Sequence, residues 1–309
     1  MTNSVATSIR ITGKTRLFAV LGDPVAQVRA PEMLNPVFSA LGIDAVLVPV
    51  QAPVGSLGEV VRGLQRSGNV DGLFITVPHK DAVRRFADVC SPAVELAGSA
   101  NVMRRGHDGR WYAENFDGAG FVSGLVASGY SPAARRVVLV GAGGAGSAIA
   151  AALMTAGVAR LDVCDLDAGR VKAVVDRLRR HWPDRIGGGP TADLGAADIV
   201  VNATPLGLRP GDPLPFGPQE LTPGTLVADI IMTPRETELL RVAAGLGLPV
   251  HHGHHMLEHQ LHLYRGFFGL DRAPSRAGTP DPSQAGTADP SQAGTADPSQ
   301  AGDGDRIAG

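Results

Sequence analysis

The sequence predicts an α/β fold with an N-terminal βα substrate-binding domain, a C-terminal Rossmann dinucleotide-binding domain and a cleft between them. Three observations support this prediction. Short apolar runs alternate with amphipathic stretches over most of the chain. One apolar run near the middle leads directly into a glycine-rich segment, 141–146. An acidic residue, Asp165, then follows at close to the roughly 20-residue distance that is typical of dinucleotide-binding folds.

The first half of the chain predicts alternating strands and helices. Strands are expected at 16–22, 45–50 and 72–76, because each is a short apolar run rich in residues that favour strands. Helices are expected to begin near Pro31 and to cover 57–65. Strands that alternate with helices form βα units, so the sheet should be mostly parallel.

A helix over 117–127 is expected to connect this set of elements to a second one. The predicted strands of the second set are 136–140, 160–164, 199–201 and 226–230, and its predicted helices are 146–156, 168–181 and 254–268. The last helical stretch is expected to pack back across the cleft. We therefore place the substrate-binding domain at 1–117 and the Rossmann domain at 118–270.

The C-terminal segment, 271–309, has a different composition. An eight-residue unit begins at Ala277 and repeats, and almost no apolar residue larger than alanine follows Ala273. A segment that cannot bury a core is expected to be disordered. Repeat expansion of an unselected terminus explains it more simply than a role in recruiting a partner.

Composition and charge exclude several classes of function. The 28 Lys and Arg residues nearly balance the 30 Asp and Glu residues, which leaves no electrostatic footprint for nucleic acid. The two cysteines are too few for a disulfide framework, and the N-terminus lacks the pattern of a secretory signal. We expect a cytoplasmic protein whose partner is a small molecule. A homodimer is compatible with the sequence, which does not fix the oligomeric state.

The uncharged stretch 137–159 is long enough to cross a bilayer. Its content favours another structure, because four strand-forming residues run into the glycines and the rest is mostly alanine. Strand, loop and helix in that order explain the stretch better than a membrane span. We expect no association with a membrane.

The glycine-rich segment predicts a cofactor site. In the pattern Gly-x-Gly-x-x-Gly, the first glycine permits a tight turn, the second admits the pyrophosphate and the third lets the helix pack against the strand. The N-terminal N–H groups of that helix face the phosphates. The expected cofactor-binding residues of the loop are Gly141, Ala142, Gly143, Gly144, Ala145 and Gly146.

Asp165 indicates which dinucleotide binds. A carboxylate at the end of the second strand accepts hydrogen bonds from the ribose hydroxyls and repels a 2′-phosphate, so we expect NAD rather than NADP. The alternative is that Asp165 caps the helix predicted from Ala168. Asp167 is better placed for capping.

Three segments of the first half carry polar groups where strands should end, namely 76–80, 97–101 and 114–118. Ligands of open α/β sheets bind at such strand ends. A lysine and an aspartate that converge there, Lys80 and Asp117, can exchange a proton with a substrate hydroxyl while hydride moves to a nicotinamide. Taken singly, Lys80 is better explained as a solvated cation at a helix start and Asp117 as the N-cap of the following helix.

Together, the motifs of the chain resemble those of the shikimate dehydrogenase family, in the family's order and up to about residue 270. The matching motifs are Gly22-Asp23-Pro24-Val25, Thr76-Val77-Pro78-His79-Lys80, Gly98-Ser99-Ala100-Asn101, Asn115-Phe116-Asp117-Gly118, 141–145, Asn202-Ala203-Thr204-Pro205 and 253–260. The resemblance implies NAD(P)-dependent oxidation of a secondary hydroxyl to a ketone on shikimate, quinate or a related cyclic polyol or hydroxy acid.

The resemblance also implies roles for individual residues. Lys80 and Asp117 become the catalytic acid/base pair. The substrate's ring hydroxyls are expected to contact Thr76, Asn101 and Gln260. The nicotinamide side is expected to be lined by Asn202, Ala203, Thr204, Ile230 and Gly253. Members that use NADP typically carry Asn-Arg-Thr or Asn-Arg-Ser where this chain has Asp165-Leu166-Asp167, which again favours NAD.

The chain departs from the family at the substrate's carboxylate. Members that act on shikimate hold the carboxylate with two serines, and here those positions are Val28 and Ala30. A tyrosine that assists them is replaced by Met232, and the Thr of the Asn-Thr-Asp-Gly motif is Phe116. Burying a carboxylate without donors costs several kcal/mol. Unless Arg29 substitutes, the substrate lacks this carboxylate or presents it differently.

One segment contains six histidines, namely His251, His252, His254, His255, His259 and His262. Three of these, His255, His259 and His262, fall on one face of the predicted helix. Such spacing can bind zinc. No His-Glu-x-x-His motif or cysteine accompanies the cluster, and the family segment that it overlays folds without metal, so we expect no metal site.

A second functional hypothesis remains open. The lost carboxylate donors and the repeat tail also fit an NAD-binding regulatory or scaffold protein with a vestigial active site. The presence of both Lys80 and Asp117 weighs against it, because a non-catalytic relative does not require the pair.

Overall fold

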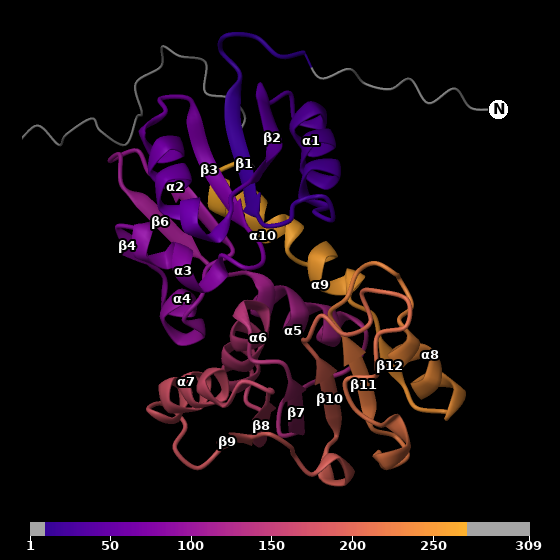
Figure 1. Ribbon diagram of the computed structural model, residues 1–309. Coiled ribbons are helices and arrows are strands. Elements are labelled where there is room, and N and C mark those ends of the chain that lie inside the picture. The colour runs from indigo at the N-terminus through magenta and orange to yellow at the C-terminus, as the bar shows by residue number, and fades with distance from the viewer. Residues whose placement is uncertain (1–9, 271–309) are drawn as a thin grey trace, which may run out of the picture. The chain divides into compact units, whose positions relative to one another are not determined.

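The computed structural model describes residues 10–270, and its elements form two six-stranded sheets with helices (Figure 1). This confirms the predicted α/β class. The repeat that begins at Ala277, and with it the prediction of a disordered tail at 271–309, lies outside the described residues. None of the helices described within 10–270 is long and apolar enough to span a membrane.

The first sheet is parallel on one side and mainly antiparallel on the other. Its strands are β1 (Arg16–Gly22), β2 (Ala45–Gln51), β3 (Val70–Ile75), β4 (Val89–Cys90), β5 (Val102–Arg105) and β6 (Trp111–Glu114), in the order β2-β1-β3-β5-β6-β4. The predicted strands are β1 to β3, which pair in parallel. The pairs β3–β5 and β5–β6 are antiparallel, so the expectation of a mostly parallel sheet fails in this part.

The helices of the first half are α1 (Ala30–Ala40), α2 (Leu57–Arg66), α3 (Lys80–Val83) and α4 (Pro92–Ala97). Helix α4 shows how local sequence sets its ends. The Ser91 hydroxyl accepts a hydrogen bond from the Val94 N–H, Pro92 fills the first turn, and Gly98 ends the helix with φ = 69°. Residues 98–101 therefore leave α4 in a defined direction.

The second sheet is parallel throughout its described strands, with the order β12-β11-β10-β7-β8-β9. The strands are β7 (Arg136–Val140), β8 (Arg160–Cys164), β9 (Ile186–Gly189), β10 (Ile199–Asn202), β11 (Leu226–Asp229) and β12 (Val250–His251). The helices are α6 (Gly144–Thr155), α7 (Ala168–Arg179) and α8 (Glu238–Gly245). Helix α6 begins two residues earlier than predicted, inside the glycine-rich segment.

Helix α5 (Asp117–Ala127) has the bounds that the sequence predicts. Glycines let other segments approach it closely. A Cβ on Gly118 would lie 2.2 Å from the Ala148 carbonyl oxygen of α6, and a Cβ on Gly120 would lie 2.5 Å from the Met256 carbonyl oxygen. Helix α5 therefore packs against α6 on one side and the start of the C-terminal helical segment on another.

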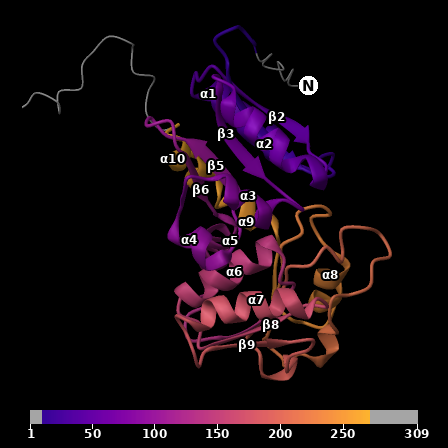
Figure 2. The same cartoon turned by 60° about the vertical axis from the view of Figure 1, so that its left-hand side comes forward.

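The predicted helix over 254–268 is two helices, α9 (His254–Glu258) and α10 (Leu261–Phe268). Both views show α10 beside the first sheet (Figures 1 and 2). Its aromatic side chains explain this position, because Phe268 contacts Phe18 and Phe74 with ring centroids 5.1 and 5.0 Å apart. The C-terminal segment thus returns to the N-terminal sheet.

Candidate active site

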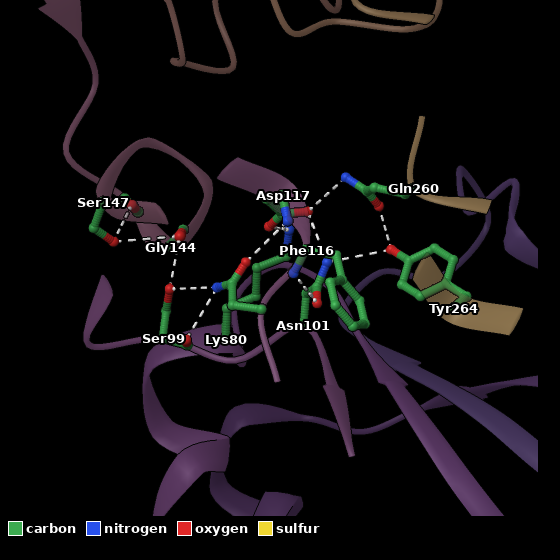
Figure 3. Close-up of polar contacts among 11 residues, drawn as sticks. Lys80, Ser99, Asn101, Phe116, Asp117, Gly144, Ser147, Gln260 and Tyr264 are labelled. Carbon is green, nitrogen blue, oxygen red and sulfur yellow. Dashed lines mark hydrogen bonds and ion pairs between the residues drawn. The ribbon is translucent and has the colours of Figure 1, made fainter. Parts of the chain in front are cut away.

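The two residues expected to form an acid/base pair are in contact. Lys80 is the first residue of α3 and Asp117 the first residue of α5. The Lys80 Nζ lies 2.5 Å from the Asp117 Oδ2, and the two side chains are 13% and 5% exposed (Figure 3). A charge-assisted hydrogen bond of this length, largely shielded from water, holds both groups in one orientation.

The other carboxylate oxygen of Asp117 accepts hydrogen bonds from two buried amides. The Asn101 Nδ2 donates to Oδ1 at 2.9 Å, and the Gln260 Nε2 donates to the same atom at 3.3 Å (Figure 3). The second N–H of Asn101 points to the Tyr264 hydroxyl, at 3.2 Å, and its Oδ1 accepts the Phe116 N–H. Asn101 thus has no N–H left for a substrate hydroxyl in this arrangement, whereas Gln260 keeps one.

Asp117 is also connected to the glycine-rich loop. The Asp117 N–H donates to the Asn115 Oδ1 at 3.0 Å, and the Asn115 amide donates to Ser99. The Ser99 hydroxyl donates to the Gly144 carbonyl oxygen at 2.8 Å (Figure 3). A continuous chain of hydrogen bonds thus runs from the loop at the start of α6 to the backbone N–H of Asp117.

The positions expected to recognise a carboxylate are apolar in their surroundings as well as in their side chains. Val28 and Ala30 are partly buried and pack against the same apolar cluster as Phe116 and Leu257. Arg29, which could have substituted for the missing donors, is half exposed and pairs with Glu32 at 2.7 Å. Among the described residues, the side chains that pack here are apolar, and the nearby Arg29 is engaged by Glu32.

Thr76 lies directly after β3, four residues before Lys80. Its backbone N–H donates to the Leu21 carbonyl oxygen at 2.9 Å. Its hydroxyl makes no hydrogen bond to any side chain of the described residues, so it can meet a ligand. Met232 is partly buried and follows β11.

The glycine-rich loop has the compact geometry that a dinucleotide site requires. Gly141 adopts φ = 110°, and its N–H donates to the Cys164 carbonyl oxygen at 2.7 Å. A Cβ on Gly146 would lie 2.0 Å from the Gly141 carbonyl oxygen, and one on Gly144 would lie 2.7 Å from the Lys80 Cβ. The first turn of α6 is thus folded against the loop and against Lys80.

Of the two aspartates after β8, Asp167 caps helix α7, as the sequence suggests, and Asp165 does not. Asp167 is the N-cap of α7, and its side chain accepts hydrogen bonds from the Gly169 and Arg170 N–H groups. The Asp165 carboxylate accepts hydrogen bonds from the N–H groups of Ala142, at 2.7 Å, and Asp167, at 2.9 Å. Asp165 therefore does not cap α7, and its carboxylate lies beside the glycine-rich loop.

The residues expected on the nicotinamide side are held by a buried network. The Asn202 Oδ1 accepts hydrogen bonds from the N–H and the hydroxyl of Thr204. The Asn202 Nδ2 donates to Asp229 at 3.2 Å, and the Thr237 hydroxyl donates to Asp229 at 2.8 Å. Burial raises the pKa of Asp229 above its usual value. These contacts fix the loop after β10.

The same network is surrounded by Ala203, Ile230 and Gly253. The Ala203 N–H donates to the Val140 carbonyl oxygen at 2.7 Å, and the Ile230 N–H donates to the Asn202 carbonyl oxygen at 3.1 Å. A Cβ on Gly253 would lie 2.5 Å from the carbonyl carbon of Ile230. All three residues lie at the carboxyl ends of second-sheet strands, where ligands of parallel sheets bind.

The sequence reasoning missed three residues of these networks, Tyr264, Asp229 and Thr237. Tyr264 belongs to no family motif quoted above, and its one signal is a spacing of four residues from Gln260, which places both side chains on one helical face. Asp229 precedes Ile230 and has the signal of a lone carboxylate at the end of an apolar strand.

The histidine cluster is partly buried, and its members contact one another. The rings of His254 and His255 lie 4.0 Å apart, and those of His251 and His255 lie 4.9 Å apart. His254, His255 and Glu258 could offer three ligand atoms to a metal ion. However, the Arg235 guanidinium lies 3.3 Å from the His254 Nε2. Its positive charge would repel a metal ion bound at that nitrogen.

The protein should lose stability in acid through His251. Burial, followed by the charge of His255, lowers the pKa of His251 to about 4, from 6.5. As the pH falls, His251 takes up a proton in the unfolded chain before it does so in the folded protein. The stabilising contribution of the neutral His251 is therefore complete above pH 6.5 and is lost as the pH falls toward 4. We expect a loss on the order of 3 kcal/mol in the free energy of unfolding.

Denaturant unfolding at a series of pH values measures this loss. His251→Phe keeps an aromatic ring beside Phe121 and removes the titrating group, so the decline between pH 6.5 and 4 should become shallower. His262→Phe, at an exposed position, is the matched control and should keep the full decline. Identical pH dependence in the His251→Phe variant and the unmodified protein would contradict the prediction.

Comparison with known proteins is consistent with this site. A profile of the shikimate dehydrogenase substrate binding domain matches residues 20–103. The NADP(+) shikimate dehydrogenase of Rubrobacter xylanophilus is 37% identical over 268 residues, which cover 85% of this chain and 94% of the relative. 

Two solved structures are also similar. Quinate dehydrogenase from Corynebacterium glutamicum, in complex with NAD, is 32% identical with a TM-score of 0.74, covering 82% of this chain and 94% of its own. Ligand-free 5-ketofructose reductase of Gluconobacter sp. strain CHM43 is 28% identical with a TM-score of 0.73, covering 83% and 94%.

Proposed function

The chain belongs to the shikimate dehydrogenase family of oxidoreductases, and from that premise we propose that it interconverts a secondary hydroxyl and a ketone on a cyclic polyol or hydroxy acid. Shikimate, quinate and related compounds are the candidate substrates. Lys80 and Asp117 are the acid/base pair. The observation that carries the proposal is the 2.5 Å contact between the Lys80 Nζ and the Asp117 Oδ2, with both groups shielded from water.

The two groups have different tasks. The Asp117 carboxylate accepts hydrogen bonds at both oxygens, so it acts as a fixed acceptor that aims the Lys80 Nζ. Lys80 in its neutral amine form takes the hydroxyl proton when the alcohol is oxidised, and the ammonium so formed, paired with Asp117, returns that proton when the ketone is reduced. Thr76 and the remaining N–H of Gln260 orient the substrate. NAD(P), when bound, supplies the hydride acceptor or donor.

The residues present fit a dinucleotide. The close approach of Gly141 to Gly146 leaves the N-terminal N–H groups of α6 facing outward for a pyrophosphate. We place the cofactor in the 118–270 part of the chain and the substrate in the 1–117 part, with α10 packed on the first sheet.

NAD is the proposed cofactor, although the Rubrobacter xylanophilus relative carries NADP(+) in its name. The proposal rests on Asp165, whose carboxylate lies beside the loop that would hold the pyrophosphate. A 2′-phosphate at this place would meet that negative charge. The similar Corynebacterium glutamicum quinate dehydrogenase was solved with NAD.

Steady-state kinetics with both cofactors test this assignment. The unmodified protein should show the higher kcat/KM with NAD. Asp165→Asn keeps the shape of the side chain and removes its charge, so the preference for NAD should fall by about tenfold, which corresponds to about 1.4 kcal/mol. Asp176→Asn, on the exposed face of α7, is the charge-matched control. A higher kcat/KM with NADP in the unmodified protein would overturn the assignment.

We propose that the substrate either lacks a carboxylate or does not direct it at Val28 and Ala30, because that wall is apolar and Arg29 is paired with Glu32. Similarity to a reductase named for 5-ketofructose, a sugar without a carboxylate, supports this view. A panel of cyclic and open-chain polyols, with quinate and shikimate included, identifies the substrate. NAD(P) binding in a calorimeter without turnover of any member of the panel would instead support a cofactor-binding scaffold.

A further inference from the structure

We propose that Tyr264 is a positioning residue for proton transfer, because its phenol fixes the amides that hold Asp117 and acts through them. This inference rests on the proposed function. Tyr264 lies on α10, at the far end of the chain from Lys80 and Asp117. Its hydroxyl nevertheless reaches both Asn101 and Gln260 (Figure 3).

The amides need an external group to fix their orientation. A primary amide has similar shape in either of its two orientations, but one presents N–H donors and the other an oxygen acceptor. Asp117 requires donors at its Oδ1. The Asn101 amide is oriented by the Phe116 N–H, which donates to the Asn101 Oδ1 at 3.0 Å. The Gln260 oxygen accepts its one side-chain hydrogen bond from the Tyr264 hydroxyl.

The hydrogen bonds around Tyr264 run in one consistent direction. The phenol donates to the Gln260 Oε1 and accepts from the Asn101 Nδ2. If the Gln260 amide turned over, its oxygen would face the Asp117 Oδ1, and two acceptors would oppose each other without a proton between them. Such a mispaired buried group is unfavourable, because no water replaces the hydrogen bond that is lost.

The position and the protonation of the phenol suit this role. The Tyr264 ring is 6% exposed and lies between Phe74 and Phe116, with centroids 5.0 and 5.6 Å away. Burial, followed by the negative charge of Asp117, raises the pKa of Tyr264 well above its usual value. The hydroxyl therefore keeps its proton and remains a donor to Gln260.

Removing the Tyr264 hydroxyl should affect the chemical step more than binding. Tyr264→Phe keeps the ring contacts with Phe74 and Phe116 and deletes one oxygen. Without the phenol the Gln260 oxygen loses the donor that holds it, so the hydrogen bond from Gln260 to Asp117 is less firmly fixed and the Lys80 Nζ is aimed less well. We expect kcat to fall by about tenfold, less than the roughly 10²–10⁴-fold that a general acid/base group itself contributes, with KM changed by less than about threefold and the Kd for NAD(P) unchanged.

A matched control and a second background make the test decisive. Tyr130→Phe removes the hydroxyl of another partly buried tyrosine, which packs on a different core cluster, and should keep full kcat. In a Gln260→Met background, where there is no amide at position 260, Tyr264→Phe should lower kcat by a much smaller factor than it does in the unmodified chain. Such non-additivity is expected of residues in contact.

The outcomes separate the two proposals. An unmodified protein without turnover on the whole polyol panel contradicts the proposed function. If the unmodified protein turns over, three results overturn the role of Tyr264 alone. These are full kcat in Tyr264→Phe, an equal loss in both backgrounds, and a loss of kcat that matches a loss of folded protein measured by circular dichroism.

Discussion

Replacement of Lys80 by alanine should lower kcat by about 10²–10⁴-fold, the range that a positioned acid/base group contributes. The Lys80 Nζ is the group proposed to meet the substrate hydroxyl. In the variant the Asp117 Oδ1 still accepts hydrogen bonds from Asn101 and Gln260, so Asp117 should stay in place and leave the position of the Nζ without an acid/base group. Cofactor binding should persist, because removal of the side chain beyond Cβ leaves the close packing against Gly144 in place. Stopped-flow or steady-state assays with the identified alcohol give kcat, and calorimetry gives the Kd for NAD(P).

The matched control for this variant is Lys172→Ala. Lys172 lies on α7, is 76% exposed and pairs with Asp176, so its loss changes the net charge equally and should leave kcat unaltered. Turnover at the unmodified rate in the Lys80→Ala variant would contradict the assignment of this lysine. Loss of NAD(P) binding together with activity would show that the variant disturbs the glycine-rich loop instead.

Gly118→Ala should destabilise the folded protein by about 3 kcal/mol, at the upper end of the usual cost of overpacking a core. The added Cβ would lie 2.2 Å from the Ala148 carbonyl oxygen and 2.7 Å from the Ala152 Cβ. The first of these is backbone, which cannot rotate away. Helix α5 would have to move from α6, and Asp117, as the neighbouring residue, would move with it. Urea unfolding measures the loss of stability, and kcat should fall in the protein that still folds.

Gly63→Ala is the control for this substitution. Gly63 lies inside α2, and a Cβ there meets no atom within 4 Å. Alanine in a helix interior is about 0.8–1 kcal/mol more favourable than glycine, so this variant should be more stable than the unmodified protein. Equal effects of the two substitutions would contradict the role given to the contact between α5 and α6.

Four of the six described strands of the second sheet could be predicted from sequence, but the short strands β9 and β12 and the helix α8 could not, and the first sheet could be predicted in part. Strands β7 and β8 are apolar runs with clear ends, and their bounds are as predicted. The hairpin of β5 and β6 is not visible in the sequence, because each strand has four residues and β5 ends in two arginines. These arginine side chains pack over aromatic rings rather than extending into solvent, as Arg104 does over Tyr112. Such a contact depends on tertiary structure and cannot be inferred from the strand's own sequence.

The candidate site shows the same limit. Motif spacing was sufficient to bring Lys80 and Asp117 together as a hypothesis, because both follow strand ends. It did not reveal that both N–H groups of Asn101 are engaged inside the protein. It also could not reveal Tyr264, whose partner Asn101 is 163 residues away. Contacts of that range follow from the packing of α10 on the first sheet.

The contact between Gly144 and Lys80 has a consequence for protein engineering. Loops that bind dinucleotides are attractive parts to transplant when a cofactor preference is to be redesigned. Here any donor loop must keep glycine at position 144, since a Cβ would lie 2.7 Å from that of Lys80. It must also present the carbonyl oxygen that the Ser99 hydroxyl contacts. A successful graft in this protein therefore has to be chosen against the shape of the substrate-binding half as well as against the cofactor.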